Sequence, residues 1–104
     1  MTDKRPALAL RRVLTHHARS RYSQRSLGDD PAGTLAEADE IPASQARRII
    51  RSLPKGMGWR HLKRYRSGGS GVAFLGGGVL FLGVRKGDAA IIATVIPYRE
   101  GRHG

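Results

Sequence analysis

The hydrophobic periodicity of this chain changes from helical to strand-like near residue 59, and this change constrains the fold most strongly. Before it, apolar residues recur at helical spacing in 6–26 and again in 43–53. After it, short β-branched runs alternate with glycine-rich turns. Helices followed by strands predict an α+β domain.

We predict one or two N-terminal helices packed on one face of a three- to four-stranded antiparallel sheet. The expected strands are 59–66, 71–75, 79–85 and 89–96, and 34–39 adds a short acidic helix within an acidic insert at 28–41. The glycine runs 68–71 and 76–78 are predicted hairpin turns, because neither carries the Lys-Ser/Thr of a phosphate-binding loop. A length of 104 residues suits a single domain, 1–104, with a frayed tail at 100–104.

The charge of the chain is strongly basic and unevenly distributed. Lys and Arg number 19 against 8 Asp and Glu, which gives a net charge of +11. Five of the eight acids lie between Asp29 and Glu40, so an acidic insert separates two basic segments. Such a balance favours a polyanionic partner, although a solvated basic surface is the simpler alternative.

The first predicted helix carries three polar residues on its apolar side. His17, Arg21 and Arg25 stand at i, i+4 and i+8 and fall within about 80° of one another at 100° per residue. The same arc contains Leu10 and Leu14. Cations on a packing face must be paired or must line a cleft that receives an anion.

Two interpretations of this cluster remain open. In the first, His17 transfers protons near neutral pH while Arg21 and Arg25 bind a phosphate, as metal-independent RNA cleavage requires. In the second, His17 is an interior histidine and the arginines pair with acids of the insert. Those acids are Glu37, Asp39 and Glu40.

The segment 17–25, His-Ala-Arg-Ser-Arg-Tyr-Ser-Gln-Arg, resembles the His-Ala-x-x-Arg-aromatic/Met-x-x-Arg opening of a group of small uncharacterised bacterial and phage domains. These are related to the barnase, EndoU, colicin and RelE-type RNase toxins. The segment 90–95 is similar to the last strand of that group, a hydrophobic run ending in Thr. The resemblance implies an RNase-toxin-like fold with RNA between helix and sheet, and it places Thr94 near the helix cluster. The acidic stretch 28–40 departs from the group.

A second cluster interleaves cations and aromatic rings along 59–66. Aromatic rings stack on unpaired bases and guanidinium groups hold phosphates, which favours RNA over DNA. The alternative is an edge strand whose cations oppose edge pairing. The candidate nucleic-acid-binding residues are Trp59, Arg60, His61, Lys63, Arg64, Tyr65 and Arg66, and His61 is also a candidate second member of an acid/base pair.

The leading hypothesis is an RNA-binding, toxin-like domain that either cleaves RNA without a metal or only binds it. A phage- or plasmid-encoded inhibitor of a host protein is the alternative from another class. We expect no cofactor, no metal site, no membrane segment and a cytoplasmic location. An acidic antitoxin or host protein is a candidate partner, and the apolar hairpin 72–84 suits either a dimer or packing on the second helix.

Overall fold

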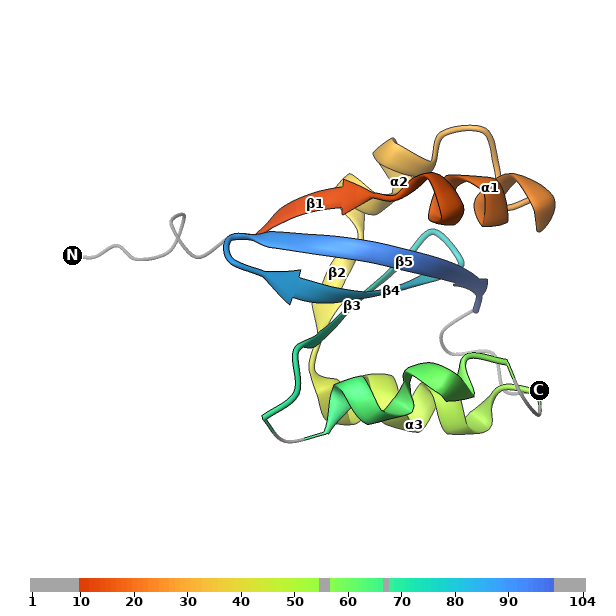
Figure 1. The fold of residues 1–104 in the computed structure, drawn as a ribbon. Coiled ribbons are helices and arrows are strands. Elements are labelled where there is room, and N and C mark those ends of the chain that lie inside the picture. Colours follow the sequence, from red (N-terminus) through yellow and green to blue (C-terminus); the bar gives the residue numbers. More distant parts are fainter. Residues whose placement is uncertain (1–9, 55–56, 67, 99–104) are drawn as a thin grey trace.

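A five-stranded mixed sheet forms the centre of the protein in the computed structural model, which describes residues 10–54, 57–66 and 68–98 (Figure 1). The strands are β1 Arg11–Leu14, β2 Asp39–Ile41, β3 Gly71–Gly76, β4 Val79–Lys86 and β5 Ala89–Pro97. The helices are α1 His16–Gln24, α2 Pro31–Glu37, α3 Ala43–Ser52 and the 3₁₀ helix η2 Trp59–Tyr65. The strand order is β1-β5-β4-β3-β2, with β1 parallel to β5 and the other neighbouring pairs antiparallel. The α+β class is confirmed, but the three- to four-stranded antiparallel sheet is wrong, because β1 and β2 add a strand at each edge and β1 is parallel to β5.

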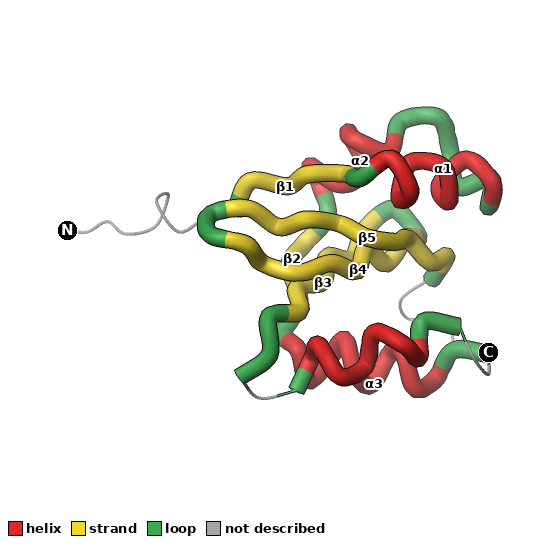
Figure 2. Tube along the Cα trace, in the orientation of Figure 1, coloured by secondary structure: helices red, strands yellow, loops and turns green. Residues whose placement is uncertain are grey.

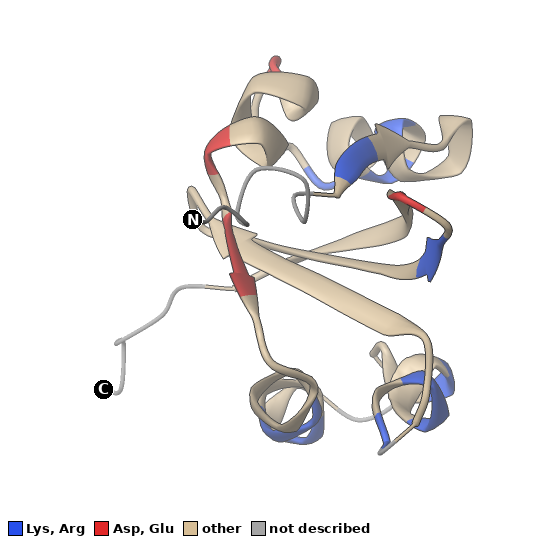
Figure 3. Ribbon diagram, turned by 90° about the vertical axis from the view of Figure 1, so that its left-hand side faces the viewer, with Lys and Arg blue, Asp and Glu red and all other residues tan. Residues whose placement is uncertain are grey.

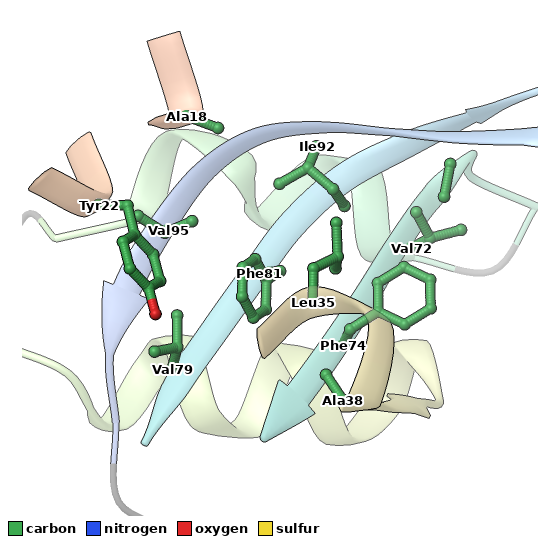
Figure 4. Packing of buried hydrophobic residues seen from close by; sticks show 11 residues of the cluster. Ala18, Tyr22, Leu35, Ala38, Val72, Phe74, Val79, Phe81, Ile92 and Val95 are labelled. Carbon is green, nitrogen blue, oxygen red and sulfur yellow. The ribbon is translucent and has the colours of Figure 1, made fainter. Parts of the chain in front are cut away.

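Both faces of the central strands are apolar, and a separate helical layer covers each face. Along β3, Phe74 belongs to one buried cluster and the next residue, Leu75, to the other. α1 and α2 cover the first face, whereas α3 and η2 cover the second (Figure 1 and Figure 2). In the first cluster, the rings of Tyr22 and Phe81 stack with their centroids 6.5 Å apart (Figure 4). The predicted placement of the helices on one face is therefore wrong, because each of the two apolar faces must be buried by a helical layer of its own.

The predicted helix over 6–26 is in fact a strand followed by a shorter helix. Thr15 ends the strand by capping α1: its hydroxyl accepts a hydrogen bond from the Ala18 amide at 3.1 Å. The backbone before it pairs with the free edge of β5. Leu10 and Leu14 pack against the cluster that contains Ala18, so the helical spacing of these residues reflects a shared core face. Residues 6–9 lie outside the described part of the chain.

The predicted strand over 59–66 is wrong, since this segment forms η2. Leu62 and Tyr65, three residues apart, both pack on the second buried cluster, which matches the three-residue turn of a 3₁₀ helix. The position that a strand would take beside β3 is already occupied by β2. η2 therefore packs on α3 and on the sheet face instead.

The remaining predicted elements have mixed outcomes. The helix 43–53 and the last three strands are confirmed as α3, β3, β4 and β5, and Gly77 and Gly78 form the first hairpin turn with positive φ. The acidic insert forms a helix earlier than predicted, α2, and then the edge strand β2. The apolar hairpin 72–84 is buried between the helical layers of this chain. None of the helices described is long and apolar enough to cross a membrane. The tail 100–104 is outside the described residues.

Arg12 joins β1 to the C-terminal end of α2. Its Nη1 donates to the carbonyl oxygens of Leu35 at 2.8 Å, Ala38 at 2.7 Å and Ala36 at 3.3 Å. Its guanidinium carbon also lies 4.3 Å from the centroid of the Phe74 ring. The last carbonyl groups of a helix have no partner within the helix, so this cation satisfies them and stabilises the helix dipole.

Replacing Arg12 should therefore destabilise the fold. We expect Arg12→Met, which keeps an apolar stem, to lower the free energy of unfolding by about 1–3 kcal/mol, because the part-buried carbonyl oxygens of Leu35 and Ala38 lose their donor. Arg11→Met is the matched control: Arg11 pairs with Asp88 on the surface, and its loss should cost less than about 1 kcal/mol. Urea unfolding measures both variants. Equal losses would contradict the role given to Arg12.

Candidate functional site

Three elements far apart in the sequence enclose a cleft of about 590 Å³. α1 and its C-terminal cap contribute His17, Arg21 and Arg25. The other lining residues are Arg60, His61 and Arg64 of η2, Ala93, Thr94 and Ile96 of β5, and Met57 and Gly58 of the loop before η2. Of these eleven residues, seven are candidates that the sequence singled out. The cleft thus unites the helix cluster, Thr94 and three members of the basic-aromatic segment.

The other candidates from 59–66 lie away from the cleft. Trp59, Lys63 and Arg66 are exposed, and Trp59 keeps 44% of its surface accessible next to Arg60. Tyr65 is 1% exposed and belongs to the hydrophobic core. Its ring therefore cannot stack on a base in this structure, and the binding role predicted for it is corrected to a structural one.

The prediction that His17, Arg21 and Arg25 lie on the apolar side of their helix is wrong: the apolar face of α1 lies on the sheet, and its polar face is turned to the cleft. Ala18 and Tyr22, four residues apart, are buried against β5 and its neighbours. His17 and Arg21 follow the same spacing one residue earlier, and the Arg21 Nε donates to the His17 Nε2 at 3.5 Å, a long contact.

β5 reaches the cleft through a β-bulge. Leu82 pairs with Thr94 while the next residue, Gly83, pairs with Ile92, so Ala93 is the extra residue. Ile92 and Ile96 belong to opposite clusters although they are four residues apart, which a regular strand does not allow. The bulge lets two consecutive residues, Ala93 and Thr94, line the cleft.

Tyr65 fixes the backbone beside this bulge. Its hydroxyl donates to the Val72 carbonyl oxygen at 2.8 Å and accepts from the Gly83 amide at 3.2 Å. A Cβ on Gly83 would lie 2.1 Å from the Ile91 carbonyl oxygen, so only glycine fits between the two strands. Burial raises the pKa of the Tyr65 phenol, which keeps it protonated.

η2 brings His61 into the cleft in its uncharged form. His61 is 9% exposed, and the Arg64 Nη1 lies 3.1 Å from its Nδ1. Because the guanidinium must be the donor, Nδ1 accepts and the ring proton belongs on Nε2. Burial, and after it the charges of Arg64 and Arg60, lower the pKa of His61 below its usual value.

Four arginines make the cleft positively charged, and no carboxylate is among its lining residues within the described part of the chain. The acids of the insert follow the α2–β2 segment, whereas basic residues occupy α1 and the opposite helical layer (Figure 3). β2 forms the sheet edge farthest from β1. Within the described residues, no ion pair joins Glu37, Asp39 or Glu40 to Arg21 or Arg25, in contrast to the structural interpretation of the cluster.

Four residues that line the cleft were not predicted from the sequence. They are Met57, Gly58, Ala93 and Ile96. Gly58 has a φ of +76°, and a Cβ there would lie 3.0 Å from the Ile96 Cδ1, so this glycine lets the loop approach β5. The glycines near residue 58 predicted a turn, but they carried no information on which strand the turn would contact. Nothing in the run 90–95 marked Ala93 as a bulge.

Comparisons of the chain with protein-family models, with curated proteins and with solved structures found no match. Its function must therefore be inferred from the cleft. Among the residues described, no three His, Cys, Asp or Glu side chains are grouped as metal ligands would be.

The contribution of Tyr65 to the bulge can be measured. We expect Tyr65→Phe to lower the free energy of unfolding by about 1–3 kcal/mol, because the Gly83 amide and the Val72 carbonyl lose a buried partner. Tyr98→Phe is the control, because Tyr98 lies at the half-buried rim of the same cluster. This substitution should lower the free energy of unfolding much less. Chemical denaturation reports the difference, and similar values for both variants would argue against the role of the hydroxyl.

Proposed function

We propose that this protein binds RNA in the cleft between α1, β5 and η2 and cleaves it without a metal ion. One observation carries the proposal: His17, Arg21, Arg25 and Thr94 line a single cleft together with the cations of η2, and none of the described residues that line it is a carboxylate. A formal charge of +4 from four arginines in about 590 Å³ suits a phosphate group. Arginine forks bind phosphate oxygens in pairs, which fixes the orientation of the strand.

The proposed reaction is transfer of the phosphoryl group to the adjacent 2′-hydroxyl. His17 removes the 2′-hydroxyl proton with an unprotonated ring nitrogen, and the 2′-oxygen then forms a bond to phosphorus. Arg21 and Arg25 stabilise the negative charge that develops on the phosphoryl oxygens, and the Thr94 hydroxyl donates to one of them. The bond from phosphorus to the 5′-oxygen breaks, and that oxygen takes a proton from an acid. The products are a cyclic 2′,3′-phosphate and a free 5′-hydroxyl.

A non-enzymatic RNA-binding module would use the same cleft and the same arginines. The binding module would differ from the proposed nuclease only in that His17 performs no chemistry, so a cleavage assay distinguishes the two functions. The alternative, an inhibitor of a host protein, would use the acidic insert and the apolar hairpin 72–84 as its interface. The hairpin is buried within this chain, which leaves only the insert for that role. An acidic antitoxin that covers the cleft, like the cytoplasmic location, stays a prediction.

The role of His17 is tested by RNA cleavage in the presence of a chelator. We expect the wild type to cleave total or transfer RNA, and His17→Ala to be slower by about 100-fold or more, since a positioned acid or base contributes 10²–10⁴. His16→Ala is the matched control, because His16 is the exposed neighbour on α1 and does not line the cleft. It should cleave at the wild-type rate.

Two results would contradict the catalytic role. If the wild type is inert in chelator although it binds RNA, the protein is a binding module. If His17→Ala and the wild type cleave equally, another group performs the chemistry.

Binding can be tested independently through its salt dependence. We expect the logarithm of the RNA affinity to fall linearly with the logarithm of the salt concentration, and each of Arg21→Gln and Arg25→Gln to reduce the slope by about 0.7 for a single strand. Arg19→Gln is the control on the same helix, because Arg19 lines a separate cavity with Arg12. The salt dependence of RNA binding by Arg19→Gln should have the same slope as that of the wild type. A flat response to salt would argue against any nucleic-acid role.

A further inference from the structure

Apart from the hydroxyls of Tyr22 and Tyr65, His61 is the only polar side chain in the buried set of the described residues, and it lies at the wall of the cleft. The hydrogen bond to its ring comes from Arg64 and occupies Nδ1. Within the described part of the chain, no protein group bonds to Nε2. A buried donor without a protein partner destabilises the folded state unless water or a ligand accepts a hydrogen bond from it. The cleft is where such an acceptor can enter.

The groups around His61 are cations or neutral. Arg60 and Arg64 stand on η2 itself, and α1 adds His17, Arg21 and Arg25 to the same cleft. β5 adds the uncharged Thr94. α3 packs on η2 and supplies Arg47, which donates to the Tyr65 carbonyl oxygen. Among the residues of 10–54, 57–66 and 68–98, no carboxylate lines the cleft, so these neighbouring cations disfavour a charged imidazole.

We propose that His61 takes up one proton when the phosphate group of the substrate, or another tetrahedral oxyanion, enters the cleft, and that in this charged form it is the acid of the cleavage reaction. The proton uptake requires only that the cleft binds an anion. The acid role rests on the proposed function.

The coupling follows from the Arg64–His61 hydrogen bond. An anionic oxygen is a stronger acceptor for a guanidinium than a neutral imidazole nitrogen, so a bound oxyanion attracts the Arg64 donor. Loss of that donor frees the Nδ1 lone pair of His61, which takes a proton from solvent. The negative charge of the ligand then stabilises the imidazolium.

In the cleavage reaction this imidazolium supplies the missing proton. As the bond between phosphorus and the 5′-oxygen breaks, Nε2 of His61 transfers its proton to that oxygen and the ring becomes neutral. His17 has meanwhile gained the proton of the 2′-hydroxyl. Exchange with water returns both histidines to their starting forms, so the step needs no other reactant.

The test is an NMR titration of the His61 ring in the full chain, with sulfate as the probe. The charge of sulfate is constant over the titration, so any linked proton belongs to the protein. We expect the pKa of His61 to be higher in sodium sulfate than in sodium chloride of equal ionic strength by about one unit or more. This shift means that sulfate binds the protonated form at least about tenfold more tightly. Equal pKa values in the two salts would overturn the proposal.

The direction of the pH dependence follows from this shift. The bound dianion raises the pKa of His61, so sulfate affinity rises as the pH falls from the pKa of the bound form to that of the free form. Outside this interval, protonation of His61 adds no pH dependence. An affinity that rises with increasing pH in the same interval would contradict the coupling.

Two substitutions test the part played by Arg64. Arg64→Gln should raise the pKa of His61 in chloride and reduce the further rise in sulfate, because the competing donor and its charge are gone. Arg85→Gln is the same substitution at the exposed end of β4, away from the cleft, and should leave both values as in the wild type. Arg64→Gln behaving like Arg85→Gln would overturn the coupling through Arg64. His61→Gln serves to assign the resonance among the four histidines.

The acid role has its own readout in the pH profile of cleavage. In the wild type, the rate should fall as the pH rises above the pKa of the anion-bound His61, and this limb should be absent in His61→Gln. A limb that is unchanged in His61→Gln overturns the acid role. If sulfate raises the pKa but the wild type cleaves no RNA, the proposed function and the acid role fail while the proton uptake stands. If RNA is cleaved without any pKa rise, only this inference fails.

Discussion

The three long strands β3, β4 and β5 carry apolar side chains on both faces, and the rest of the structure depends on covering both of them. One helical layer cannot do this, so the chain places α1 and α2 on one side of the sheet and α3 and η2 on the other. At the end of β5, α1 from one layer and η2 from the other border the same cleft. The site is thus a consequence of how a sheet with two apolar faces is enclosed.

Backbone irregularity then decides what this cleft contains. The bulge at Ala93 changes which side of β5 the following residues face, and it leaves Thr94 at the cleft and Val95 in the core. The Tyr65 hydroxyl holds the neighbouring strand at Gly83, so the same residue that ends η2 also supports the bulge. A core hydrogen bond and the position of a candidate catalytic residue are therefore linked.

The arginines of this chain serve different purposes that net charge does not separate. Arg12 and Arg47 donate to backbone carbonyl groups and act within the fold. Arg21, Arg25 and Arg64 line a cleft in which the structure describes no carboxylate side chain. The acids that could have neutralised them are held on the α2–β2 segment by helix capping and by pairing with β3. A charge of +11 indicates a polyanion partner, but it is the separation of the insert acids from α1 and η2 that leaves four arginines together in one cleft.

The sequence by itself determined the α+β class, the helix α3, the last three strands and the candidate group of His17, Arg21 and Arg25. Local periodicity, turn glycines and spacing along a helix contain that information, because they depend on neighbours within a few residues. Only the tertiary structure decided that residues 11–14 form a parallel edge strand, that 59–66 is a 3₁₀ helix, and that His61 faces the same cleft as His17. These outcomes depend on which sheet edges are free and on which apolar face still needs a cover. Both are properties of the assembled sheet, and no short window of sequence records them.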